Sequence, residues 1–158
     1  NVDDEVLQEQ LAGSGAVLMG RRMFSGGSGP WADDPNAGGW WGDESPFNVP
    51  VLVLTHHPRE QLELKGGTFT FVTDGLESAL EQAKAVAGDK YVGVGAAGIV
   101  QQCIKAGLLD EIHVDLVHVL LGGGVSLFDH LGTGPIDLQS TRVIDGTGVT
   151  HLTFRVIK

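Results

Sequence analysis

The chain has 158 residues, 42% of them hydrophobic, and carries 20 acidic against 10 basic side chains, a formal net charge of -10 at pH 7. A chain of this length can bury one sizeable core, so we expect a single domain over residues 1–158. The acidic balance argues against a nucleic-acid partner, because affinity for a phosphate backbone rests on clusters of Lys and Arg. The only cysteine, Cys103, excludes an intrachain disulfide and a multi-cysteine zinc site. No apolar run is long enough to cross a membrane, and we expect a cytoplasmic protein without a membrane partner.

The first predicted elements are a helix at the start of the chain and a buried strand after it. Val6, Leu7 and Leu11 recur at helical spacing behind an acidic first turn. Residues 16–20 are wholly apolar up to a closing glycine, which is typical of a strand buried on both faces. A second helix is predicted to begin at Arg21.

Residues 25–48 are rich in Gly, Pro, Asp and Trp and show no sustained periodicity. Two interpretations of this segment stay open. It is either a functional loop or a surface excursion that packs Trp31, Trp40 and Trp41 against the core.

Two further helices are predicted in the middle of the chain. Asp74 and Glu77 resemble a capping box, and the spacing of the apolar residues that follow predicts a helix up to Gly88. Another helix is predicted over residues 98–106 and ends at Gly107.

Strands account for the other periodic segments, and the last two are joined by a short Asp-Gly loop that predicts a hairpin. These strands are predicted over residues 49–54, 69–72, 91–94, 111–121, 136–144 and 151–157. The pattern therefore predicts an α/β fold, with a mostly parallel central sheet covered by helices and antiparallel strands at its C-terminal edge.

The histidines and the cysteine are expected to have structural roles. His113 and Asp115 share one face of the strand predicted over residues 111–121 and are expected to pair. His118, on the other face, is expected to be a core histidine, and Cys103 a core thiol. No histidine pair has the spacing of a helical zinc motif, so we expect no metal site.

Three predicted strand ends carry the residues that are best suited to bind a ligand. In an open α/β sheet, ligands collect at the carboxyl ends of the strands, where loops and helix N-termini present backbone N–H groups. For the two arginines the alternative is a solvated start of a helix, and for Thr55 and His56 it is a turn before Pro58. The residues at these ends are Gly20, Arg21 and Arg22; Thr55 and His56; and residues 95–98.

Gly93, Gly95 and Gly98 formally match the Gly-x-Gly-x-x-Gly dinucleotide fingerprint. Only a short stretch of strand precedes the first glycine, which argues against a Rossmann site. A turn that approaches a phosphate fits better, and a tight turn that needs glycine only for its φ freedom is the remaining alternative.

Five segments, residues 17–24, 51–56, 71–75, 106–111 and 119–128, together resemble the dihydrofolate-reductase-like family. The resemblance is to the reductase domain of the bifunctional deaminase-reductases of riboflavin biosynthesis and its stand-alone bacterial relatives. It implies a three-layer fold of the dihydrofolate reductase type, with NADPH across the strand ends. The first strand of that fold has no counterpart here, so an N-terminal strand is expected to be missing.

The resemblance also implies roles for the residues at the strand ends. Gly20, Arg21 and Arg22 match the segment that holds the NADPH phosphates, and Thr55 and His56 match the segment near the adenosine 2′-phosphate. The turn and helix start under the pyrophosphate correspond to Gly95, Ala96, Ala97, Gly98, Ile99 and Val100. Relatives commonly have adjacent glycines where this chain has Gly95 and Ala96, and the added Cβ reduces the space for a pyrophosphate.

The implied function is NADPH-dependent reduction of a small heterocycle by hydride transfer, with a 5-amino-6-ribosylaminouracil phosphate or a pterin as the type of substrate. The protein would supply orientation and charge stabilisation, and no catalytic residue is assigned. Two alternatives stay open, a dihydrofolate reductase proper and a catalytically silent homologue that binds a ligand or dimerises. A homodimer through the strand predicted over residues 111–121 is consistent with each of them.

Overall fold

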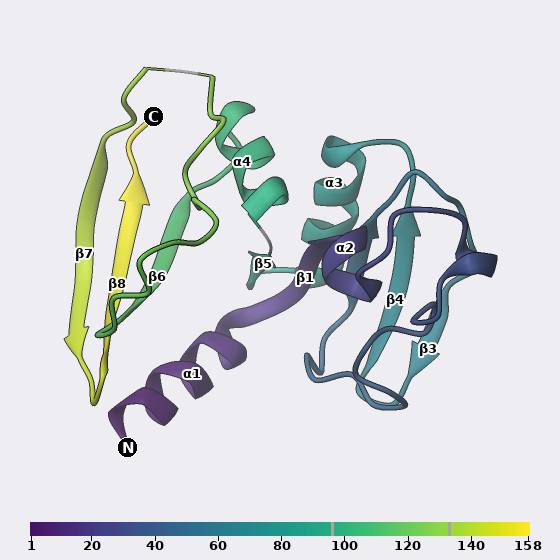
Figure 1. Cartoon of the computed structure of the whole chain (residues 1–158), viewed down its shortest axis with the longest axis horizontal. Helices are drawn as coiled ribbons and strands as arrows, with labels where there is room; N and C mark the ends of the chain where they lie inside the picture. The colour runs from purple at the N-terminus through teal and green to yellow at the C-terminus, as the bar shows by residue number, and fades with distance from the viewer. Residues whose placement is uncertain (96, 133) are drawn as a thin grey trace. The chain divides into compact units, whose positions relative to one another are not determined.

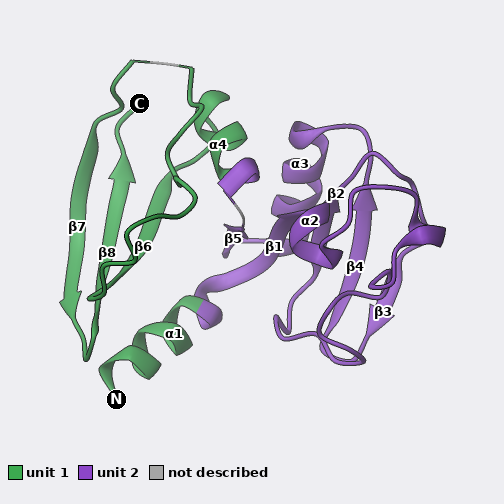
Figure 2. Cartoon of the chain, viewed as in Figure 1, with its two compact units in different colours: residues 1–10, 100–158 green, residues 11–99 purple. Residues whose placement is uncertain are grey.

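The computed structural model describes residues 1–95, 97–132 and 134–158. Its helices are α1 (Val2–Gly13), α2 (Arg21–Ser25), α3 (Leu76–Ala87) and α4 (Ala97–Lys105), with a short 3-10 helix at Trp31–Asp33 (Figure 1). The strands are β1 (Ser14–Gly20), β2 (Val51–Leu54), β3 (Leu62–Leu64), β4 (Gly67–Val72), β5 (Tyr91–Val94), β6 (Glu111–Val117), β7 (Leu138–Asp145) and β8 (Val149–Val156). The chain divides into two compact units, residues 11–99 and residues 1–10 with 100–158 (Figure 2). No helix in the described ranges is long and apolar enough to span a membrane.

The unit of residues 11–99 contains a five-stranded sheet in the order β3-β4-β2-β1-β5. β4, β2, β1 and β5 run parallel, and β3 is antiparallel to β4. The predicted strands of this region are confirmed, as is the mostly parallel sheet. β3 was not predicted, because a three-residue strand is too short to show a period.

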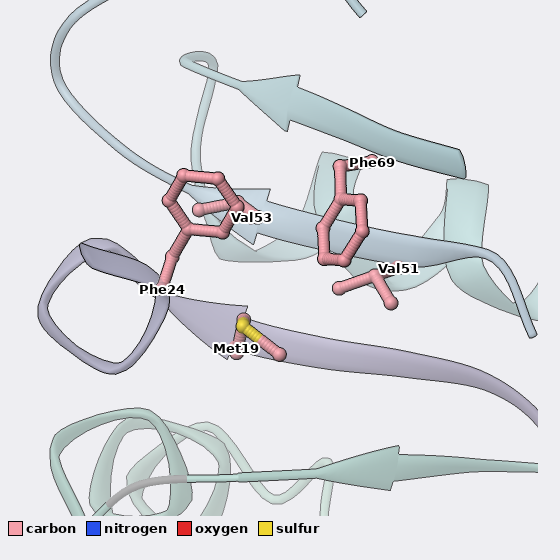
Figure 3. Packing of buried hydrophobic residues seen from close by; sticks show 5 residues of the cluster. All are labelled: Met19, Phe24, Val51, Val53 and Phe69. Carbon is pink, nitrogen blue, oxygen red and sulfur yellow. The ribbon is translucent and has the colours of Figure 1, made fainter. Parts of the chain in front are cut away.

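One face of this sheet carries a cluster of fully buried side chains, contributed by three strands and α2. Its members are Met19, Phe24, Val51, Val53 and Phe69 (Figure 3). The ring centroid of Phe24 lies 5.5 Å from that of Phe69 and 5.2 Å from that of Phe71. Because successive side chains of a strand point to opposite faces, Leu18 and Leu52 face away from the cluster. Helix α3 packs against β1, β2 and β5.

The long loop over residues 25–48 packs on this cluster through two of its three tryptophans. Trp31 and Trp41 lie against the cluster, and the Trp41 ring stacks on Phe69 at a centroid distance of 5.3 Å. Trp40 is 63% exposed, although its indole N–H donates to the carbonyl of Met23. The packing interpretation is therefore right for Trp31 and Trp41 and wrong for Trp40.

The helix predicted up to Gly88 is confirmed as α3, but the predicted capping box is wrong. The residue at the N-cap is Gly75, with a φ of 103°, and no side chain caps the helix. The helix therefore starts one residue later than the box requires, so Asp74 lies outside it and Glu77 stands at the second helical position. At the other end Gly88, with a φ of 65°, donates its N–H to the carbonyl of Lys84.

The other unit contains α1 as far as residue 10 and a three-stranded antiparallel sheet in the order β6-β8-β7. The predicted hairpin is confirmed as β7 and β8. The strand predicted over residues 111–121 ends early, at Val117, because the N–H of Val119 turns back to the carbonyl of Val117 at 2.8 Å. Beyond that turn Leu120 is fully exposed. The homodimer expected through this segment stays a prediction.

Three expectations about single side chains have different outcomes. Cys103 is buried, as predicted, and burial raises the pKa of its thiol. His118 is exposed rather than in the core, and its Nε2 lies 2.7 Å from Oγ1 of Thr150. The predicted pairing of Asp115 with His113 is also wrong, because the β6–β8 register places Asp115 opposite His151.

His151 is the centre of a charged cluster that ties the start of α1 to this sheet. Its Nε2 lies 2.7 Å from the carboxylate of Asp3, and its Nδ1 lies 2.7 Å from that of Asp115. The hydrogen bond to Asp3, followed by that to Asp115, raises the pKa of His151 above its ordinary value of 6.5. The same contact lowers the pKa of Asp3 below its ordinary value of 3.8.

We expect Phe24→Ala to lower the free energy of unfolding by about 3–5 kcal/mol, because it empties the centre of the buried cluster. Val86→Ala, which removes a half-exposed side chain from α3, is the control and should change it by less than about 0.5 kcal/mol. Urea unfolding followed by circular dichroism measures both. A cost for Phe24→Ala no larger than that of the control would contradict the central role of this cluster.

We expect His151→Gln to destabilise the protein more at about pH 5.5 than at about pH 8.5, because the folded pKa of His151 is raised and its stabilisation is lost as the pH rises through that value. The Asp3 carboxyl acts in the opposite sense, since its stabilisation is lost only as the pH falls through its lowered pKa. His118→Gln is the control, because that ring contacts a hydroxyl rather than a carboxylate. Unfolding midpoints at both pH values measure the effect, and a pH-independent cost for His151→Gln would contradict it.

Candidate functional site

The carboxyl ends of β1, β2 and β5 lie at one edge of the parallel sheet. Gly20 is in register with Leu54, and Leu18 is in register with Val94. The β2–β4 ladder continues one bond further, because the N–H of Thr55 donates to the carbonyl of Val72, and so does the β1–β5 ladder, because the N–H of Gly95 donates to the carbonyl of Leu18, both at 3.0 Å. The structure therefore brings together the three strand ends that were singled out in the sequence.

Arg21 is held in a buried network rather than presented at this edge. Its side chain is 7% exposed and that of Asp34 is 3% exposed, with 2.5 Å between Nη2 and the carboxylate. Nε also donates to the Ser25 hydroxyl and Nη1 to the carbonyl of Gly29. A hydrogen bond from Ser25 and a second from Arg21 hold the pKa of Asp34 below its ordinary value. The guanidinium of Arg21 is thus committed to the loop that follows α2.

Arg22 differs from Arg21 in its surroundings. It is exposed, and its guanidinium makes no hydrogen bond or ion pair with any residue that the structure describes. An unengaged guanidinium can bind a phosphate through two parallel hydrogen bonds. Of the two arginines, Arg22 is the one available for a ligand.

Thr55 and His56 differ in the same way as the two arginines, because the first is buried and the second is exposed. Thr55 is 5% exposed, and its Oγ1 accepts the backbone N–H of His57 at 3.2 Å. This contact is the turn before Pro58 that the sequence left open as an alternative. His56 is exposed, so its imidazole can reach a ligand beyond the end of β2.

Helix α4 begins beside the end of β5, and Ala97 and Gly98 form its first turn. A Cβ added at Gly98 would meet no heavy atom within 4 Å, so the backbone is open there. Neither Gly95 nor Gly98 has a positive φ, so the interpretation of a turn that needs glycine for φ freedom is wrong for both. The first N–H groups of a helix have no acceptor within it and can bind an anion.

Ile99 and Val100, in the predicted phosphate turn, have apolar side chains that offer no hydrogen bond to a phosphate. Ile99 is 6% exposed and packs toward Gly20, where an added Cβ would lie 3.3 Å from its Cγ1. This packing places Ile99 against the end of β1. Val100 is half-buried in the same helix, and Ala96 lies outside the described residues.

Arg59 belongs to the same edge and was not identified from the sequence. Its guanidinium carbon lies 4.6 Å from the ring centroid of Trp31 and 4.5 Å from that of Phe71, the residue before the end of β4. Burial, and then the charge of Arg21, lower the pKa of Arg59. The signal that could have found it is a cation directly after Pro58, in the loop that leaves the second strand end.

In the parts of the chain that the structure describes, no group of three or more His, Cys, Asp or Glu side chains is placed to hold a metal ion. The candidate site consists of the first N–H groups of α4, the exposed side chains of Arg22 and His56, and Arg59 stacked on two aromatic rings. Such an arrangement can bind and orient an anion.

A family model described as the RibD C-terminal domain matches residues 2–150 of this chain. No curated protein matches it in sequence.

Solved structures match almost the whole chain. A riboflavin biosynthesis protein from a Shewanella species, described as putative in its name, superposes with a TM-score of 0.70 at 19% identity, covering 96% of this chain and 78% of that one. The deaminase/5-amino-6-(5-phosphoribosylamino)uracil reductase of Thermotoga maritima gives 0.60 at 14%, covering 98% and 48%. The dihydrofolate reductase of Enterococcus faecalis, solved with NADP(H), gives 0.55 at 15%, covering 99% and 82%. These likenesses show the dihydrofolate-reductase-like fold.

We expect Asp34→Asn to lower the midpoint of urea unfolding well below that of Asp33→Asn, because only Asp34 neutralises the buried Arg21. Asp33 is the adjacent exposed carboxylate, so it provides a matched control for the same chemical change. Because the folded pKa of Asp34 is lowered, the difference should shrink as the pH falls through that value. Equal midpoints for the two variants at neutral pH would show that the pair does not stabilise the fold.

Proposed function

We propose that this chain is an NADPH-dependent reductase of a small heterocycle. It belongs to the RibD C-terminal domain family, whose members are reductases. One observation supports this more than any other. Anion-binding groups from the ends of β1, β2 and β5 meet at one edge of the sheet. This edge is where α/β sheets bind nucleotides.

The residues at this edge fit a phosphorylated dinucleotide. The open backbone at Gly98 leaves room for a pyrophosphate beside the first N–H groups of α4. Arg22 and His56 are exposed and can approach the phosphates and the adenosine. Arg21 would act indirectly, since its pair with Asp34 fixes the segment from which Arg22 extends.

When bound, the nicotinamide supplies a hydride, and the protein contributes binding, orientation and the exclusion of competing reactions. No nucleophile is required for this chemistry. The proposed substrate is a flat heterocycle of the 5-amino-6-ribosylaminouracil phosphate or pterin type. The name of the Thermotoga maritima protein supports the first type and that of the Enterococcus faecalis protein the second.

We expect NADPH to bind with micromolar affinity, about -8 kcal/mol, and Arg22→Ala to weaken it about ten-fold by removing a charge-assisted contact to phosphate. Lys84→Ala is the control, because it also removes one exposed positive charge from this unit. α3 runs from the carboxyl end of β4 toward the amino end of β5, so Lys84, in its last turn, lies away from the proposed site. Titration calorimetry with NADPH and NADH measures all three proteins.

Turnover with the ribosylaminouracil phosphate and with dihydrofolate, followed by nicotinamide absorbance, then separates the two reductase alternatives. Failure of the wild-type protein to bind either nucleotide would overturn the proposed cofactor. Binding without turnover of either substrate would favour the silent homologue.

A further inference from the structure

Trp40 is an exposed aromatic residue in the loop that covers the buried cluster. Its side chain is 63% exposed, and in the described part of residues 11–99 no other large hydrophobic side chain is as exposed. Trp31 and Trp41, from the same loop, pack against the cluster. An indole ring that stays in water gives up the free energy that its burial would provide. Packing therefore accounts for two of the three tryptophans of the loop and not for Trp40.

The exposed ring is nevertheless restrained. Its indole N–H donates to the carbonyl of Met23 at 2.8 Å, and its ring centroid lies 5.2 Å from that of Trp41 at an interplanar angle of 60°. The Trp41 ring is itself held, because it stacks on Phe69 at an interplanar angle of 19°. The backbone of Gly39 closes over its edge, since an added Cβ there would lie 2.8 Å from the Trp41 ring. A ring that is restrained before binding loses little conformational freedom when a ligand contacts it.

The hydrogen bond to Met23 also decides what the Trp40 ring can offer to a ligand. The last carbonyl groups of a helix have no donor within it, so the N–H of Trp40 satisfies one of those of α2. This contact uses the only hydrogen-bonding atom of the indole, and the exposed remainder is π surface. Capping α2 requires the N–H alone and does not explain an exposed ring. A π surface in water favours a flat aromatic ligand, which stacks on it.

Trp40 lies close to the carboxyl edge of the parallel sheet. Met23, whose carbonyl it contacts, directs its side chain toward the end of β5, where a Cβ added at Gly95 would lie 2.8 Å from the Met23 Sδ. A single residue therefore connects Trp40 to the strand end beside which α4 begins. The groups assigned at this edge so far bind anions, and Trp40 adds an apolar face to them.

We propose that Trp40 stacks on the flat heterocycle of the substrate and so favours a conjugated ring over a ligand that carries only the phosphate. The candidate anion-binding groups hold the cofactor through its phosphates, whereas the ring that is to be reduced needs a surface that orients it. This proposal rests on the proposed function, and it specifies the substrate-binding surface of the same site.

The test compares Trp40→Phe with Trp40→Leu by titration calorimetry. Both variants lack the N–H that contacts Met23, but only the phenylalanine retains an aromatic ring, so a difference between them reports stacking rather than capping of α2. The ring probes are biopterin and 5,6-diaminouracil, and ribose 5-phosphate is the probe without an aromatic ring. Tyr91→Leu is the matched control, because it removes a half-exposed aromatic ring from the first residue of β5, at the amino end of the strand.

We expect Trp40→Leu to weaken the binding of the ring probes about ten-fold and Trp40→Phe to weaken it less. Ribose 5-phosphate and NADPH should bind both variants as they bind the wild type. Tyr91→Leu should bind every probe as the wild type does.

Equal weakening of the ring probes in Trp40→Phe and Trp40→Leu would show that Trp40 acts only through the cap of α2, and would overturn the proposal. A loss of NADPH affinity with unchanged ring-probe affinity would assign the ring to the cofactor instead, with the same consequence. Dissociation of a dimer in Trp40→Leu, measured by size-exclusion chromatography, with unchanged ring-probe affinity would assign it to a contact between copies and also overturn the proposal.

The failure of this proposal is distinguishable from that of the proposed function. If the wild type binds a ring probe but not NADPH, the proposed cofactor fails, and the comparison of the two Trp40 variants still tests the stacking surface. Binding of neither ring probe to the wild type overturns the stacking surface whether or not NADPH binds. If Trp40→Leu does not fold, as judged by circular dichroism, oxidation of the wild type by N-bromosuccinimide decides the outcome. Biopterin should then slow oxidation at Trp40, located by mass spectrometry, and unchanged oxidation overturns the proposal.

Discussion

The ion pair between Arg21 and Asp34 determines how the carboxyl edge of the parallel sheet is built. Both side chains are almost fully excluded from solvent, so the two charges lose hydration that must be replaced within the protein. Ser25 and the carbonyl of Gly29 supply the additional hydrogen bonds. Because Asp34 belongs to the irregular loop and Arg21 directly follows β1, the pair holds that loop against the end of the strand. The pair thereby places the Trp31 ring against Arg21, and Arg59 stacks on the same Trp31 ring.

The elements with regular periods could be predicted from the sequence, and so could the convergence of the strand ends. A buried parallel strand is marked by a continuous apolar run, and parallel strands that share a register end at the same edge. The role of Arg21 could not be predicted, because its partner lies 13 residues away in a loop without a period. A guanidinium after an apolar strand has the same local sequence whether it faces a ligand or a buried carboxylate.

The errors at single side chains arise where the local sequence pattern does not determine the contacts of a residue. His118 was assigned to the core from strand alternation, but β6 ends before it, and alternation has no meaning beyond the end of a strand. Asp115 was paired within its own strand, whereas the antiparallel register places it opposite His151, whose Nδ1 lies 2.7 Å from its carboxylate. Arg59 was overlooked because its rings come from Trp31 in the loop and Phe71 in β4.

The net charge of -10 is not spread evenly over the protein, and one edge of the parallel sheet is locally positive. Three of its 10 Lys and Arg residues, namely Arg21, Arg22 and Arg59, lie at the carboxyl edge of the parallel sheet, where a single buried carboxylate opposes them. Charges separated by more than about 8 Å are largely screened at physiological ionic strength, so the acidic residues elsewhere contribute little at this edge. Since Arg21 is neutralised by Asp34, the remaining positive charge at this edge is carried by Arg22 and Arg59. These two arginines differ in their surroundings, because Arg22 is exposed and makes no hydrogen bond with a described residue, whereas the Arg59 guanidinium lies over the rings of Trp31 and Phe71.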